Sequence, residues 1–196
     1  FHDNEKVLLR VVTPNYNHAE VEGLRAGFEF PGRLAPVVFH ANLHDAALRD
    51  LHWSSDCYVT VSRGEGWGLG AFEAMLVGNP VIAPAYGGFI DFLDGDLADV
   101  YWINYQETPA IVPPTASPNV IEVAGLRITP VVHHVHDGVR GDQLWAEPDL
   151  PRTARHMREC YEVRRGMTSR QPYKQPHPFS YEVVGRKLIG ILHEVI

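Results

Sequence analysis

Short apolar runs alternate with amphipathic stretches along the first half of the chain. Five runs have the length of a strand and no polar alternation, as is typical of strands buried on both faces of a sheet. They are Val7–Thr13, Pro36–His40, Cys57–Val61, Pro80–Ala83 and Val100–Ile103. Between them, apolar residues recur at helical spacing and predict helices over Ala19–Phe28, His44–Trp53, Leu69–Val77 and Phe89–Leu93. This alternation predicts an α/β fold with a Rossmann-like, doubly wound parallel sheet.

A different pattern follows in the middle of the chain. Residues 109–141 are rich in proline and histidine and contain two alternating apolar runs, Val120–Val123 and Leu126–Val132. The Ala-Gly dipeptide between these runs suits a hairpin turn. We interpret the segment as an inserted β-arm within one domain that spans residues 1–196.

Two helices are expected in the last third of the chain. Asp149 and Pro151 have the order of an N-cap and a first-turn proline, and they predict a helix that ends near Arg165. A proline-rich linker, residues 168–178, leads to a C-terminal helix within residues 179–196. The apolar residues of this helix form one stripe, which we interpret as a packing face: Val184, Leu188, Ile191, Leu192 and Val195.

Composition and charge narrow the class of protein. The 196 residues are 45% hydrophobic and 21% charged, a profile typical of a globular domain with its own core. The net charge of -7, with no basic run, argues against a nucleic-acid-binding protein. No run approaches the ~18 apolar residues of a membrane span.

The cysteines and the first residues bear on the cellular context. Two cysteines, Cys57 and Cys160, are too few for a disulfide framework and predict buried thiols in a reducing compartment. The first residues, from Phe1 to Lys6, have the pattern of neither a signal peptide nor a natural start. We therefore expect a piece of a longer cytoplasmic protein, whose full-length form either is free or lies peripherally at a membrane.

The candidate chemistry lies directly after the third predicted strand, in residues 61–75. Four alternating glycines there allow close approach of a ligand to the backbone. The next helix begins near Gly68, where unpaired N–H groups and the positive end of the helix dipole favour a phosphate. Glu65 and Glu73 stand on either side and can accept hydrogen bonds from hydroxyl groups, worth about 1.5–3 kcal/mol each when charge-assisted. Together these groups describe a pocket for a nucleotide sugar.

Other interpretations of the same residues remain open at this point. A glycine cluster can form a tight turn without a ligand, with Glu73 as a solvated helix residue. Residues 66–71 also fit Gly-x-Gly-x-x-Ala, the pattern of dinucleotide sites, but the following strand ends at Pro84 without the acidic residue that such a site needs. Three histidines and an aspartate within residues 133–137 can ligate zinc or nickel. We interpret that cluster as a surface loop and predict no metal site, because no second group supplies a distant ligand.

Residues 62–88, SRGEGWGLGAFEAMLVGNPVIAPAYGG, resemble the signature of the retaining, GT-B-fold glycosyltransferases of group 1. Glu65 and Glu73 have the spacing of the family's two glutamates, residues 78–82 match its Gly-x-Pro-Val-Ile strand, and Gly87-Gly88 matches the turn that follows. The resemblance extends from His44 to the C-terminal helix and covers about two thirds of the chain.

The resemblance implies the carboxyl-terminal, donor-binding half of a GT-B fold. Members of the family transfer a sugar from a nucleotide-sugar donor with retention of configuration and need no cofactor or metal. By similarity, Glu65 holds sugar hydroxyls and is the catalytic candidate, and Glu73 holds the ribose diol. The backbone of the turn contacts the sugar at Gly66, Trp67 and Gly68 and the diphosphate at Leu69 and Gly70. Trp67 stands where the family usually has phenylalanine.

The chain also departs from the family pattern. The arginine and lysine that neutralise the diphosphate, and the amino-terminal acceptor domain, have no counterpart in it, so we expect no transfer by this chain alone. The expected partners are a nucleotide sugar, a glycan, lipid or small-molecule acceptor, the absent domain, and a second copy through the apolar stripe. Two alternatives are a non-catalytic sugar-nucleotide-binding subunit and another GT-B enzyme, an epimerase or a phosphorylase. A phosphorylase needs a cofactor-bearing lysine, and none of Lys6, Lys174 and Lys187 has a suitable context.

Overall fold

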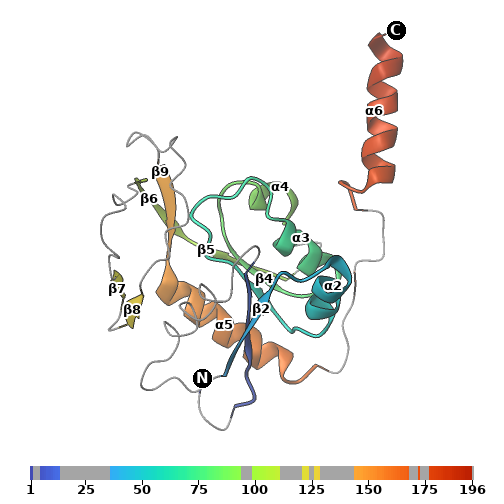
Figure 1. Cartoon of the computed structure of the whole chain (residues 1–196). Coiled ribbons are helices and arrows are strands. Elements are labelled where there is room, and N and C mark those ends of the chain that lie inside the picture. Colours follow the sequence, from blue (N-terminus) through green and yellow to red (C-terminus); the bar gives the residue numbers. More distant parts are fainter. Residues whose placement is uncertain are drawn as a thin grey trace. The chain divides into compact units, whose positions relative to one another are not determined.

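The computed structural model describes residues 1, 5–13, 36–93, 99–110, 121–123, 126–128, 144–167, 172 and 177–195. The chain divides into two compact units (Figure 1). The first comprises Phe1–Leu51 and Tyr105–Glu147, and the second comprises His52–Asn104 and Pro148–Ile196. The predicted helix over Ala19–Phe28 lies outside the described residues.

The described residues of the first unit form three pairs of strands. Strands β1 (Leu9–Thr13) and β2 (Val37–Ala41) are parallel, which confirms the first two predicted strands. Strands β7 (Ile121–Val123) and β8 (Leu126–Ile128) are antiparallel, with Val123 opposite Leu126, as the predicted hairpin requires. Strands β6 (Tyr105–Pro109) and β9 (Leu144–Pro148) also pair. Helix α2 (Asp45–Trp53) leads into the second unit, to which its His52 belongs.

The second unit is built on a three-stranded parallel sheet in the order β3-β4-β5. Its strands are β3 (Tyr58–Val59), β4 (Val81–Pro84) and β5 (Val100–Ile103). All four residues of the central strand β4 are buried. The absence of polar alternation in the sequence therefore correctly predicted a sheet that is covered on both faces.

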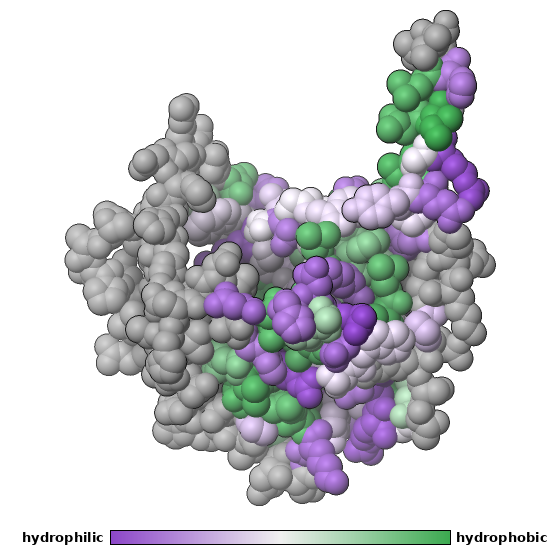
Figure 2. All heavy atoms as spheres, turned by 45° about the vertical axis from the view of Figure 1, so that its right-hand side comes forward, coloured by the Kyte–Doolittle hydropathy of each residue, from purple (hydrophilic) through white to green (hydrophobic). Residues whose placement is uncertain are grey.

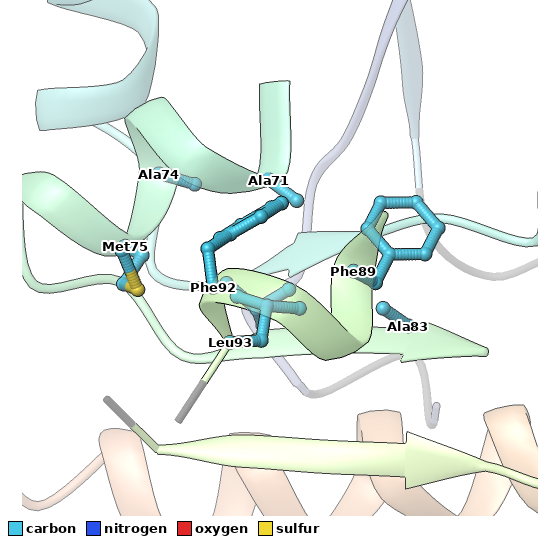
Figure 3. Close-up of a cluster of buried hydrophobic side chains, with 8 residues drawn as sticks. Ala71, Ala74, Met75, Ala83, Phe89, Phe92 and Leu93 are labelled. Carbon is cyan, nitrogen blue, oxygen red and sulfur yellow. The ribbon is translucent and has the colours of Figure 1, made fainter. Parts of the chain in front are cut away.

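Each face of this sheet carries its own apolar cluster. On one face, α3 (Leu69–Leu76) and α4 (Phe89–Phe92) pack against β4 (Figure 3), and the buried residues there are Ala71, Ala74, Met75, Val81, Ala83, Phe89, Phe92 and Leu93. On the other face, Ile82 and Ile103 pack with Cys160 of α5 (Leu150–Arg164). Neighbouring β4 residues thus point to opposite helix layers, which confirms the predicted Rossmann-like, doubly wound architecture.

The last two helices begin as the sequence predicts. The Asp149 side chain accepts a hydrogen bond from the Arg152 N–H (2.8 Å), and a proline follows in the first turn of α5. Helix α6 (Tyr181–Val195) starts after Ser180, whose hydroxyl oxygen accepts from the Val183 N–H (3.4 Å).

The apolar stripe of α6 does not pack against the described part of the chain. Its described side chains are 45–57% exposed and form an apolar surface on the helix (Figure 2): Val184, Leu188, Ile191 and Leu192. The expectation of a packing face is therefore not met within these residues. None of the helices in the described ranges combines the length and hydropathy of a membrane span.

Candidate functional site

The glycine-rich turn joins the carboxyl end of β3 to helix α3. Gly68 precedes the helix in a left-handed conformation, with φ +87° and ψ +53°, which strongly favours glycine. Its carbonyl oxygen accepts hydrogen bonds from the N–H groups of Ala71 and Phe72, both at 3.0 Å. Within the described ranges, no acceptor pairs with the N–H of Leu69 or Gly70. The first turn of α3 therefore presents two donors at the positive end of the helix dipole.

Three glycines of the site are required by close packing inside the protein. A Cβ on Gly68 would lie 2.3 Å from an aromatic carbon of helix α4. A Cβ on Gly87 would lie 2.5 Å from the Glu65 carbonyl oxygen, and one on Gly88 would lie 2.2 Å from that of Gly66. The Gly88 N–H also donates to the Glu65 carbonyl oxygen (3.4 Å). The turns that follow β3 and β4 are therefore in direct backbone contact.

Gly64 and Gly66 have a different environment. A Cβ on either residue would meet no atom of the described residues within 4 Å, so packing within this part of the chain does not require glycine at these positions. Both lie beside open space at the carboxyl end of a parallel strand, where ligands bind in open α/β sheets. This difference weakens the purely structural interpretation of the glycine cluster.

The structure brings both predicted glutamates to this turn. Glu65 lies within it, and Glu73 lies in the second turn of α3, and both are partly exposed. The charges of both carboxylates act on a third side chain, Tyr58 of β3. Burial raises the pKa of the Tyr58 hydroxyl, and the negative charges of Glu65 and Glu73 raise it further. A Cβ on Gly70 would lie 2.6 Å from the Tyr58 hydroxyl oxygen, so this hydroxyl reaches the first turn of α3.

Glu73 has a buried neighbour on helix α2. The Nε2 atom of His52 lies 3.5 Å from Glu73 Oε2, and the His52 side chain is 8% exposed. Burial lowers the pKa of His52, and the nearby Glu73 charge opposes this effect without reversing it. The His52 and Tyr58 rings are 5.9 Å apart. Tyr58, His52 and Glu73 thus form one corner of the site, contributed by β3, α2 and α3.

An aromatic cluster supports the turn from the other side. The Trp67 ring lies 5.0 Å from that of Phe92 and 4.8 Å, edge-on, from that of Phe179. The Phe72 ring in turn contacts His177 at 4.9 Å. Burial lowers the pKa of His177. The tryptophan therefore does more than preserve a backbone role, because its side chain fixes the turn to α4 and to the segment before α6.

Several residues of the site were not identified from the sequence. Tyr58 and His52 precede the glycine-rich turn, and Phe179 lies more than 100 residues after that turn. The one usable signal is Tyr58 itself, a side chain with a hydroxyl group in the strand-like run of residues 57–61 that leads directly into the glycine-rich turn. No group of three or more metal-ligating side chains occurs where the structure is described. The histidine cluster at 133–137 lies outside those ranges, so its interpretation stays a prediction.

Comparison with known proteins gives one result. A family model described as glycosyl transferases group 1 matches residues 2–119, which is more than half of the 196 residues. The matched range includes β3, the glycine-rich turn, α3 and both glutamates. No curated protein and no solved structure matches the chain.

Proposed function

The chain belongs to the group 1 glycosyltransferases, and from this premise we propose that it binds a nucleotide-sugar donor whose sugar is transferred with retention of configuration. The observation that carries the proposal is the arrangement around the turn of residues 62–68. Two carboxylates, and two amides that have no acceptor among the described residues, flank a backbone that is open at Gly64 and Gly66. This combination suits a ligand that is anionic in one part and rich in hydroxyl groups in another.

The diphosphate is assigned to the first turn of α3. The N–H groups of Leu69 and Gly70 are free to donate to phosphate oxygens, and the helix dipole adds a favourable field. When the bond between the sugar and the diphosphate breaks, negative charge grows on the phosphate oxygens. Fixed donors at that position stabilise the developing charge, and removal of one such donor from an enzyme typically costs about 3–4 kcal/mol.

Each of the two carboxylates binds a different set of hydroxyl groups of the donor. Glu73, in the second turn of α3, accepts hydrogen bonds from the vicinal diol of the ribose. Glu65, within the turn, accepts from hydroxyls of the transferred sugar and is the catalytic candidate. The backbone beside the sugar is that of Gly66, Trp67 and Gly68. Since a Cβ at Gly66 would project into the open space, the sugar can approach the main chain there.

Donor binding is the part of the function assigned to this chain. No described residue is assigned to the acceptor, and transfer needs an acceptor held against the sugar in a reactive geometry. A donor-binding subunit without its own transfer activity therefore remains the second candidate. A transferase and a donor-binding subunit can be distinguished by incubating the chain with donor and a cell-extract acceptor pool. Only a transferase passes sugar to an acceptor.

A thermal-shift panel tests the proposal. Uridine, guanosine and adenosine diphosphates, their sugar conjugates and NAD are each added at increasing concentration. A ligand at 100 times its dissociation constant stabilises the protein by about 2.7 kcal/mol. We expect at least one nucleoside diphosphate or its sugar conjugate to raise the melting temperature. Stabilisation by NAD together with no response to any sugar nucleotide would contradict the proposal.

A further inference from the structure

Glu73, the proposed ribose ligand, is contacted by a histidine that the proposed function leaves without a role. His52 Nε2 and Glu73 Oε2 are 3.5 Å apart, and their side chains are 8% and 45% exposed. One end of this contact is thus anchored in the interior of the second unit, and the other end reaches solvent. The two atoms are within ion-pair distance but do not meet the geometry of a hydrogen bond, and catalytic hydrogen bonds that are long in the free protein often tighten when a ligand binds.

His52 is itself held in place by its surroundings. Its carbonyl oxygen accepts a hydrogen bond from the Asn79 side-chain amide (2.7 Å), and Asn79 is 1% exposed. Its ring lies beside the ring of Tyr58. The imidazole is therefore a fixed point from which a partly exposed carboxylate can be oriented.

Orientation matters because a glutamate side chain has several rotamers. Fixing a long polar side chain in one rotamer costs conformational entropy. A group that is already oriented before the ligand arrives avoids part of this cost on binding. A neighbour that engages one carboxylate oxygen also leaves the second oxygen to accept from the ligand.

We propose that His52 is a positioning residue for the donor: it holds Oε2 of Glu73 so that the carboxylate is oriented toward the ribose diol. This inference rests on the proposed function, since it concerns the site in which Glu73 binds ribose. The neutral imidazole suits the role, because it donates one N–H without cancelling the carboxylate charge. Burial, which lowers the pKa of His52, favours that neutral form at pH 7. Glu73 on α3 and Tyr58 on β3 are ionisable side chains of the described residues that face the ring.

The test compares variants of His52 with a ligand pair that differs only in the diol. Calorimetry first identifies the tightest binder among uridine, guanosine and adenosine diphosphates, and the same measurement is repeated with its 2′-deoxy form. His52→Leu should weaken binding of the ribonucleotide about 2- to 10-fold, the lower part of the range expected for a coupled pair, and should leave the affinity for the 2′-deoxynucleotide almost unchanged. His52→Gln retains an N–H at similar reach and should restore most of the loss. If His52→Leu does not fold, His52→Asn replaces it, because its amide is too short to reach Glu73.

The double variant separates positioning from a purely structural role. If His52 acts through Glu73, then His52→Leu/Glu73→Gln should bind the ribonucleotide no more weakly than Glu73→Gln alone. Arg49→Gln is the control, because Arg49 lies on an exposed part of the same helix, where its side chain pairs with Asp50. Equal losses for both nucleotides, or additive losses in the double variant, would overturn the inference.

The same data distinguish failure of the inference from failure of the proposed function. If Glu73→Gln weakens the ribonucleotide and His52→Leu does not, only the role of His52 is wrong. If no nucleoside diphosphate binds, or Glu73→Gln has no effect, the assignment of the ribose to Glu73 is wrong and the inference falls with it.

Discussion

Gly88 provides a direct test of the contact between the two turns. A Cβ added at Gly88 would lie 2.2 Å from the Gly66 carbonyl oxygen and 2.7 Å from the Trp67 Cα. Both neighbours are backbone atoms, so no flexible side chain can move aside to relieve the overlap. The backbone of Gly88 has φ -63°, which alanine adopts readily, so any effect of Gly88→Ala arises from this overlap and not from strain in φ.

The expected cost follows from the distances. A carbon atom does not approach a carbonyl oxygen much closer than about 3.3 Å, so the turns must separate by roughly 1 Å. Overpacking of this kind typically costs about 1–3 kcal/mol. In a protein of this size, 1 kcal/mol corresponds to a change of about 2–4 °C in melting temperature. The displaced turn should also bind the nucleoside diphosphate more weakly, because the amides of α3 follow it.

Two other glycines supply matched controls for this prediction. Gly64→Ala and Gly66→Ala place the same methyl group in open space, so their thermal stability should equal or slightly exceed that of the unmodified protein. Urea unfolding followed by tryptophan fluorescence measures all three variants. If Gly88→Ala is as stable as Gly64→Ala, the two turns are not in contact and the packing argument is refuted.

Three further predictions concern the carboxylates, a histidine and the thiols. Glu73→Gln should weaken the bare nucleoside diphosphate, whereas Glu65→Gln should weaken only its sugar conjugate; calorimetry that finds equal losses with both ligands would reverse these roles. Burial lowers the pKa of His177 in the folded state. Near pH 6 the unfolded state therefore binds more protons than the folded state, so the free energy of unfolding should fall as the pH drops through the ordinary histidine pKa of about 6.5. His177→Phe should reduce that slope in thermal melts between pH 7.5 and 5.5, and an unchanged slope would show that His177 does not cause it. A hydrogen bond with Cys160, together with burial, raises the pKa of the Cys57 thiol, and Cys160 is only 2% exposed. The native protein should therefore react slowly with a disulfide reagent at pH 8 and rapidly in urea, and fast reaction of both thiols in the native protein would contradict the packing of this pair.

The sequence predicts the fold of the second unit well because the relevant signal is local. The central strand β4 is buried on both faces, and its unbroken apolar run indicates this directly. The start of α5 is also predictable, because the N-cap aspartate and the proline that mark it lie within one helical turn of each other. Strands β6 and β9 were not predicted, because Gln106 and Glu107 interrupt the apolar pattern and the partner strand lies about 40 residues away.

The candidate site also combines residues that the sequence predicts with residues that it does not. Glu65, Glu73 and the four glycines of residues 64–70 lie within one turn and one helix. Their spacing in the sequence therefore already places them together. His52 and Phe179 reach the site only through tertiary packing, which spacing along the chain does not encode. The separate roles of the glycines also needed the structure, because only the surroundings of each Cβ distinguish Gly66 from Gly88.

Amide hydrogen exchange shows whether the donor diphosphate binds at the first turn of α3, as we propose. Exchange at individual residues is measured with and without a saturating nucleoside diphosphate. The account predicts that the N–H groups of Leu69 and Gly70, which have no acceptor among the described residues, become protected, while those of β1 do not change. Protection of other segments, with no change at Leu69 and Gly70, would contradict it.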